Sequence, residues 1–90
     1  MYLVKLTSKA RRELDKIVEE RDVENIVATM KALGGNPRPP GVKNLKGNIH
    51  RVRVGDWRII YAVSEKDRLV MVGKIVRRSE DTYDRVKDLF

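Results

Sequence analysis

Three arginines alternate with apolar residues in residues 48–61, NIHRVRVGDWRIIY: Arg51, Arg53 and Arg58. The guanidinium group is planar and permanently charged, and its N–H donors fit the geometry of phosphate oxygens. Like charges directly across a sheet are mildly destabilising, so three converging arginines need either solvent or an anion. Two interpretations therefore stay open at this point: a solvated outer face of a sheet, and a site for a polyanion such as nucleic acid.

The turn in the middle of this stretch decides which side chains share a face. Gly55-Asp56 fits a two-residue hairpin turn, in which glycine supplies the positive φ that such turns need. With Val54 paired to Trp57, Arg53 faces Arg58. Alternation then places the three arginines on one face and the apolar side chains on the other: Val52, Val54, Trp57, Ile59 and Tyr61.

His50 is the only histidine, and an imidazole has an ordinary pKa suited to proton transfer near neutral pH. Alternation turns it toward the face of Val52 and Trp57, however, which favours a structural role. One histidine and scattered carboxylates also offer no cluster of ligands, so we expect no metal site and no cofactor.

Composition limits the class of protein. The 90 residues are enough for one domain, residues 1–90, and the net charge of +7 points to phosphate backbones or an acidic partner. Cysteine is absent, which excludes disulfides, thiolate metal sites and cysteine nucleophiles. Early charges do not fit a signal peptide, and no apolar run approaches the roughly 18 residues of a membrane span, so we expect a soluble, cytoplasmic protein.

The chain before the hairpin predicts one strand, two helices and a loop. Residues 2–6 alternate as a strand, and Ser8 is placed to cap a helix. Apolar residues at helical spacing predict helices over residues 9–20 and 23–33, and Gly34-Gly35 ends the second helix where a left-handed residue is usual. The following segment, residues 36–47, carries all three prolines and predicts a loop.

After the hairpin, the apolar run over residues 69–76 fits a central strand, and Ser79 is placed to cap a short last helix. We therefore expect an α+β fold with an N-terminal strand, a two-helix hairpin packed on a four-stranded, mainly antiparallel sheet, and a short C-terminal helix. The arginine-bearing face of that sheet would stay open.

Four features follow one another along the chain: NPRPPGVKNLKG at residues 36–47, HRVRVGDWRIIY at residues 50–61, a strand ending in Arg77-Arg78, and a helix carrying Tyr83. Together they resemble the RelE/ParE superfamily of toxins from toxin–antitoxin modules, and archaeal RelE-like toxins most of all. The resemblance implies cleavage of messenger RNA in the ribosomal A site, inhibition of translation, and neutralisation by a RelB-like antitoxin that wraps the toxin. ParE relatives share the fold and poison DNA gyrase.

The resemblance also implies roles for residues near the expected active site. Arg58 matches a catalytic arginine of the family. Arg77 matches the arginine that closes the active site, six residues before the C-terminal tyrosine, which is Tyr83 here. Arg78 is an alternative to Arg77, because the spacing is ambiguous by one residue.

Four further basic residues match functional positions of the family. The resemblance implies RNA binding by a set of basic residues: Lys43, Lys46, Arg51 and Arg78. Arg51 and Arg53 stand where well-known bacterial RelE toxins have lysines. Lys43 and Lys46 match basic loop positions that hold ribosomal or messenger RNA in the family. The replacement of lysine by arginine makes these strand positions weaker candidates for a general base, because the pKa of arginine lies above 12.

The implied chemistry is metal-independent cleavage of RNA by its own 2′-hydroxyl group. It needs a base, stabilisation of the charged phosphorane, and a proton for the leaving 5′-oxygen. Arginine suits the second task, so we expect Arg53, Arg58 and Arg77 to stabilise charge. Tyr83 is a candidate proton carrier because nearby arginines favour the phenolate, although it also begins an apolar stripe that fits a packing role.

Two classes of function stay open. One is a ribosome-dependent endoribonuclease, in which the ribosome fixes the substrate and reduces the need for a strong base. The other is a non-enzymatic binder, either a ParE-like gyrase inhibitor or a catalytically inactive RNA-binding relative. Arginines at positions 58 and 77 favour RNA cleavage. The positive charge and an apolar groove beside the helices predict a tight hetero-oligomer with an acidic antitoxin.

Overall fold

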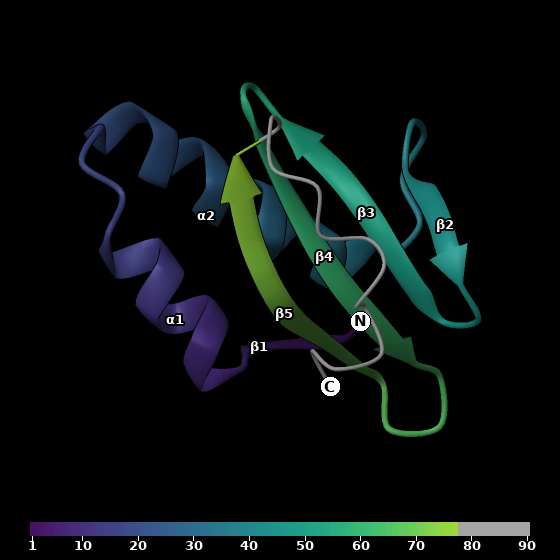
Figure 1. The fold of residues 1–90 in the computed structure, drawn as a ribbon. Coiled ribbons are helices and arrows are strands. Elements are labelled where there is room, and N and C mark those ends of the chain that lie inside the picture. The colour runs from purple at the N-terminus through teal and green to yellow at the C-terminus, as the bar shows by residue number, and fades with distance from the viewer. Residues whose placement is uncertain (78–90) are drawn as a thin grey trace.

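The computed structural model describes residues 1–77, which form a five-stranded sheet and two helices (Figure 1). Along the chain the elements are β1 (Leu3–Leu6), α1 (Ser8–Asp15), α2 (Glu20–Gly35), β2 (Lys43–Lys46), β3 (Ile49–Val54), β4 (Trp57–Ser64) and β5 (Leu69–Arg77). The strand order is β1-β5-β4-β3-β2; β1 runs parallel to β5, and the other neighbours are antiparallel. The expected last helix, Arg78 and Tyr83 lie outside the described residues.

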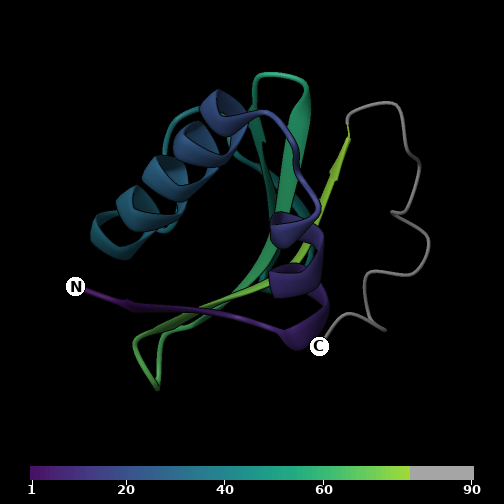
Figure 2. The same cartoon turned by 90° about the vertical axis from the view of Figure 1, so that its left-hand side faces the viewer.

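The helices and the sheet enclose one core. In the two views α2 crosses one face of the sheet and α1 lies beside β5 (Figures 1 and 2). The buried core is built from small and large apolar side chains of both helices and of β4 and β5: Ala10, Ile26, Met30, Leu33, Trp57, Ile59, Tyr61, Val63, Val70, Val72 and Ile75. The expected α+β class and the packing of helices on the apolar face are confirmed.

The sheet has five strands, so the expectation of four is wrong. The extra strand is β2, within the segment predicted as a loop, and it pairs with β3 at the edge of the sheet. Prolines lack the N–H that a ladder needs, and the last of them is Pro40, so pairing starts only after it. The amide of Asn44 then fixes the tight return to β3 by donating to the Gly47 carbonyl at 2.8 Å and the Ile49 carbonyl at 3.2 Å.

The helix boundaries also differ from the prediction. Thr7, rather than Ser8, caps α1, because its Oγ1 accepts from the Ala10 N–H at 3.1 Å. Helix α1 ends at Asp15, five residues earlier than expected, and α2 begins at Glu20. The β-branched side chains at residues 17 and 18 favour helix weakly, and the link between the helices reverses the chain so that α2 can cross the sheet.

Gly34 has a different role from the one predicted. The glycines with positive φ among the described residues are Gly41, Gly47 and Gly55, so no left-handed glycine ends α2. Instead the Gly34 carbonyl accepts from the Tyr2 N–H at 2.7 Å, and a Cβ at Gly34 would lie 2.9 Å from the Tyr2 carbonyl oxygen. Glycine is needed there because two backbones approach each other closely.

Candidate RNA-binding face

Cations from three neighbouring strands meet on the face of the sheet opposite α2. Arg53 of β3 pairs directly with Arg58 of β4, while Arg51 of β3 pairs with Lys43 of β2. We call these four residues the arginine face. Cβ atoms directly opposite in an antiparallel sheet are about 4.5–5.5 Å apart, so the four charges form one cluster. The predicted hairpin register is confirmed, and Gly55 has the expected positive φ, 58°.

The arginine face is partly shielded from water. Arg53 is exposed, whereas Arg51 and Arg58 are half-buried and their Nε atoms are buried. Ile60 and Val76 lie on the same face, because Ile60 pairs with Arg51 and Val76 with Arg58, and both are buried. A less polar neighbourhood strengthens the attraction between a guanidinium group and a phosphate.

Lys46 lies farther along β2 than the rest of the cluster. It is exposed and pairs with Ile49, beyond a register shift that separates it from Asn44. The structure therefore brings Lys43 into the arginine face and leaves Lys46 at the far end of the edge strand.

Arg77 is not brought together with Arg58, contrary to the expectation that both act in one site. Arg77 pairs with Trp57, which faces the core, and its Cζ lies 4.7 Å from the centroid of the Trp57 ring. The same indole donates from Nε1 to the Asp22 carboxylate at 3.0 Å. Since neighbours across a sheet share a face, Arg77 stacks on the tryptophan on the side opposite Arg58.

His50 and Tyr61 have structural surroundings, as alternation predicted. His50 is buried, its Nδ1 lies 3.3 Å from the Asn44 amide nitrogen, and its ring centroid lies 5.6 Å from that of Tyr61. The Tyr61 hydroxyl donates to the Pro37 carbonyl at 2.6 Å, and burial raises the pKa of Tyr61 to about 12. These contacts tie the proline segment to β3 and β4.

Sequence reasoning missed Lys74, which lies at the edge of the arginine face. It pairs with Ile60, so it continues a row that runs across four strands through Lys43 and Arg51. Lys74 is buried, and its Nζ donates to the Glu13 carboxylate at 3.0 Å. The sequence does hold one sign of Lys74: it is the single charged residue in the interior of the apolar strand β5.

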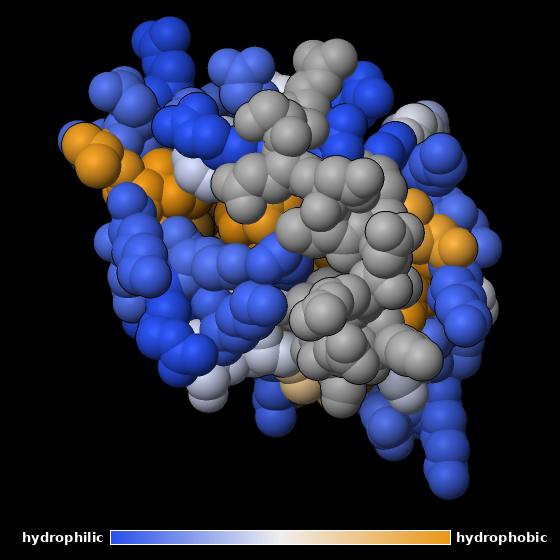
Figure 3. All heavy atoms as spheres, in the orientation of Figure 1, coloured by the Kyte–Doolittle hydropathy of each residue, from blue (hydrophilic) through white to orange (hydrophobic). Residues whose placement is uncertain are grey.

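The rest of the described surface offers fewer candidates. The coloured surface in Figure 3 is mostly hydrophilic, with small hydrophobic areas between the hydrophilic ones. Val18, in the link between α1 and α2, is 92% exposed. Within residues 1–77, no group of three or more histidine, aspartate or glutamate side chains is placed to hold a metal ion. No helix of this part is long and apolar enough to cross a membrane.

Comparison with known proteins places this chain in a family. The family described as "ParE toxin of type II toxin-antitoxin system, parDE" matches residues 4–82. This chain belongs to the RelE/ParE toxin superfamily. Toxin RelE of Mycobacterium tuberculosis is 30% identical over 80 residues, which cover 87% of this chain and 82% of the relative.

Solved structures of superfamily members agree with this assignment. One is the toxin in the archaeal RelE–RelB complex of Pyrococcus horikoshii OT3, with a TM-score of 0.80 and 25% identity over 89% of this chain and 98% of that one. Another is the toxin in the toxin–antitoxin complex RelBE2 of Mycobacterium tuberculosis, with a TM-score of 0.74 and 25% identity over 86% and 98%. This RelE/ParE toxin therefore has a RelE-like fold, with the arginine face on the side of the sheet opposite α2.

Proposed function

We propose that this toxin of a type II toxin–antitoxin module is a ribosome-dependent endoribonuclease that cleaves messenger RNA in the A site and so inhibits translation. The observation that supports this proposal is the direct pairing of Arg53 with Arg58, flanked by Arg51 and Lys43. Two guanidinium groups fixed on adjacent strands suit the oxygens of one phosphodiester. A toxin that acts only on a protein has no evident need for this arrangement.

In the proposed reaction the 2′-oxygen of the substrate forms a bond to phosphorus and the bond from phosphorus to the 5′-oxygen breaks. The products are a 2′,3′-cyclic phosphate and a 5′-hydroxyl. Arg53 and Arg58 stabilise the negative charge that develops on the non-bridging oxygens, while Arg51 and Lys43 hold flanking phosphates. The guanidinium groups of the three arginines stay protonated throughout the reaction, so they take no proton from the 2′-hydroxyl.

Proton transfer is assigned to other groups. Tyr83, which the family resemblance places at the scissile phosphate, is our proposed proton carrier. The ribosome supplies the in-line geometry that makes a weak base sufficient. Arg78, directly after Arg77 in the sequence, takes the role first expected for Arg77, since Arg77 stacks on Trp57 on the other side of the sheet.

The test is primer extension on messenger RNA programmed into ribosomes, with the wild type beside Arg58→Ala, Arg78→Ala and Arg77→Ala. Loss of one preorganised charge stabiliser lowers the cleavage rate about 10²- to 10³-fold, which we expect for Arg58→Ala. Arg77→Ala is the matched control and should keep cleavage within a few-fold, because its side chain lies over Trp57. No cuts with the wild type, or undiminished cuts with Arg58→Ala, would contradict the nuclease proposal.

We further propose that an acidic, RelB-like antitoxin neutralises the toxin. Two of the similar structures are complexes of a toxin with its antitoxin, and the net charge of +7 favours an acidic partner. Titration of the toxin with the product of a neighbouring reading frame should give a stable complex that no longer cleaves. Binding that does not weaken with added salt would speak against charge complementarity.

The match to a ParE toxin family supports a second candidate, inhibition of DNA gyrase. Supercoiling by purified gyrase, measured with toxin and without ribosomes, separates the two. Inhibition of supercoiling together with intact messenger RNA in the ribosome assay would replace the nuclease proposal with this one.

A further inference from the structure

Helix α1 takes a place beside β5 that β1 leaves free. Strand β1 pairs with β5 only as far as Leu6 and Val72. Beyond that point one oxygen of the Glu13 carboxylate accepts from the Ile75 N–H at 2.9 Å, and the other accepts from Lys74 Nζ at 3.0 Å. A side chain of α1 thus bonds to the open edge of the sheet, and the helix lies next to the end of the row formed by Lys43, Arg51, Ile60 and Lys74.

One cation of α1 lies at the unfavourable end of the helix. The first turn has no acidic residue and contains Lys9, whereas Arg12 lies in the last turn, where a basic residue is favourable. Positive charge near a helix N-terminus opposes the helix dipole. Arg11 forms an exposed ion pair with Asp15 at 3.6 Å, whereas no salt bridge within residues 1–77 joins Lys9 or Arg12 to an acid.

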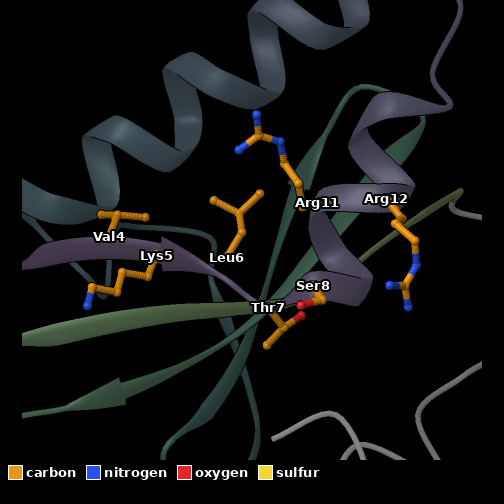
Figure 4. Close-up of a pocket in the computed structure, with 7 residues that line it drawn as sticks. All are labelled: Val4, Lys5, Leu6, Thr7, Ser8, Arg11 and Arg12. Carbon is orange, nitrogen blue, oxygen red and sulfur yellow. The ribbon is translucent and has the colours of Figure 1, made fainter.

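Arg11 and Arg12 point to different sides of α1. Figure 4 shows both at the hollow of about 640 Å³ that β1 and the start of α1 line, with Arg11 directed toward α2 and Arg12 directed away from it. Lys9 and Arg12 are three residues apart and therefore share one side of the helix. Both are exposed, so this pair of cations faces solvent on the side away from α2.

Lys9 also lies close to the buried Lys74. Its hydrogen-bond contact and charge repulsion with Lys74 lower the pKa of Lys9, and the charge of Arg12 acts in the same direction. Glu13, whose negative charge acts on Lys9 in the opposite direction, is already bonded to Lys74 and to the Ile75 N–H. Three cations around one engaged carboxylate leave an excess of positive charge that an anion would relieve.

The chemistry of this surface selects a phosphate backbone over an amphipathic acidic helix. A partner helix needs an apolar groove for its apolar stripe. The apolar residues of α1 do not face this side, because Ala10 is fully buried in the core and Leu14 packs against it. The exposed groups are ammonium and guanidinium, which suit phosphates.

We propose that Lys9 and Arg12 of α1 form a second RNA-phosphate-binding site, which the buried charge of Lys74 in β5 reinforces and which continues the arginine face around the edge of the sheet. This inference rests on the proposed function, since it assumes that RNA occupies the arginine face. Helix α1 would then bind the RNA phosphates that flank the cleaved segment.

The experiment measures binding of the full chain to a short, fluorescein-labelled 2′-O-methyl RNA, which lacks the attacking hydroxyl, over a series of salt concentrations. Four proteins are compared: the wild type, Lys9→Ala/Arg12→Ala, Arg53→Ala/Arg58→Ala, and Lys31→Ala/Lys66→Ala. The last variant is a control that removes two charges from exposed positions on α2 and on the β4–β5 turn.

The α1 variant should bind about 10- to 30-fold more weakly at about 0.1 M salt, and its slope of log K against log salt should fall by about 1.4, since each contact with single-stranded phosphate contributes about 0.7. The control should bind like the wild type. A charge-preserving variant, Lys9→Arg/Arg12→Lys, should also bind like the wild type, which separates loss of charge from loss of fold.

The outcomes separate this inference from the proposed function. If the arginine-face variant binds weakly and the α1 variant binds like the wild type, the second site is wrong and the first stands. If neither variant binds more weakly, RNA recognition by the sheet fails as well. An α1 variant that loses affinity for a polyglutamate peptide and keeps affinity for RNA would assign the surface to an acidic protein and overturn the proposal.

Discussion

At the scale of single residues, the buried ring of His50 holds β2 against β3. Its Nδ1 lies 3.3 Å from the Asn44 amide nitrogen, and it accepts from that nitrogen in the neutral tautomer that carries its proton on Nε2. Burial lowers the pKa of His50, and the charge of Arg38 adds to the effect. In a protonated ring, Nδ1 carries a proton and would face the N–H donors of the Asn44 amide. The protonated ring would also place a charge in a buried position.

We therefore predict that the free energy of unfolding decreases in mild acid. Because the folded state holds the pKa of His50 below the unfolded value of about 6.5, the unfolded chain binds more protons, and stability present above that pH is lost below it. Urea unfolding at about pH 7.5 and about pH 5.5 measures this, with His50→Gln as the control that cannot titrate. An equal loss of stability in His50→Gln would assign the effect to other groups.

The contrast between Arg58 and Arg77 shows which residue positions the sequence predicts. Arg53 and Arg58 flank a two-residue turn, so the turn and the alternation fix their pairing. The position of Arg77 depends on pairing between β4 and β5, which includes a register shift between Ile60 and Tyr61 and follows a longer turn. A spacing carried over from relatives cannot reveal which face such a residue occupies, because a shift by one residue reverses it.

At the scale of elements, the contact between the end of α2 and the residue before β1 depends on a missing side chain. A Cβ at Gly34 would lie 2.9 Å from the Tyr2 carbonyl oxygen, whereas one at Gly35 would meet nothing within 4 Å. Backbone cannot yield as a flexible side chain can, so an added methyl group must push α2 away from β1.

We predict that Gly34→Ala destabilises the fold by about 1–3 kcal/mol, as overpacking usually does. The neighbouring Gly35→Ala should be neutral or stabilise by up to about 1 kcal/mol, because alanine favours helix and restricts the unfolded chain. Urea unfolding of both variants under the same conditions gives the comparison. Equal effects of the two substitutions would show that close approach is not what requires Gly34.

The elements that the sequence predicted well are those fixed by local pattern. The hairpin and the apolar strand β5 follow from alternation, turn residues and a continuous apolar run. Strand β2 was missed because its four residues, KNLK, follow three prolines and carry little β propensity; its pairing comes from β3. The early end of α1 at Asp15 likewise depends on the path to α2, which tertiary packing sets.

At the scale of the whole molecule, four cations gather on the face of the sheet opposite α2. The arginine face follows from the sequence, because alternation within the hairpin places like charges together. The position of α1 beside the edge of β5 does not, because the bonds of Glu13 to Lys74 and Ile75 join residues about sixty positions apart. Contacts at this separation carry no local signal, so the extension of the basic surface onto α1 could only come from the structure.

The arrangement of the arginine face should lower the free energy of unfolding. Arg53 lies directly opposite Arg58, and like charges so placed repel each other in the absence of an anion. Removing one of them should therefore raise the free energy of unfolding, by about 0.5 kcal/mol at low ionic strength, while cleavage is lost. The variant that tests this is Arg53→Gln, which keeps the side chain polar.

Thermal unfolding of Arg53→Gln and of Lys31→Gln, an exposed control on α2, should be compared in low salt and in about 1 M salt. We expect the unfolding temperature of Arg53→Gln to exceed that of Lys31→Gln at low salt only. At 1 M salt the Debye length is about 3 Å, so the repulsion between Arg53 and Arg58 is screened and its removal gains little. Inorganic phosphate should raise the unfolding temperature of the wild type more than that of Arg53→Gln, since an anion on the face offsets the repulsion. A variant that loses stability at low salt would mean that Arg53 supports the sheet, and the arginine pair would then be a structural feature of the hairpin.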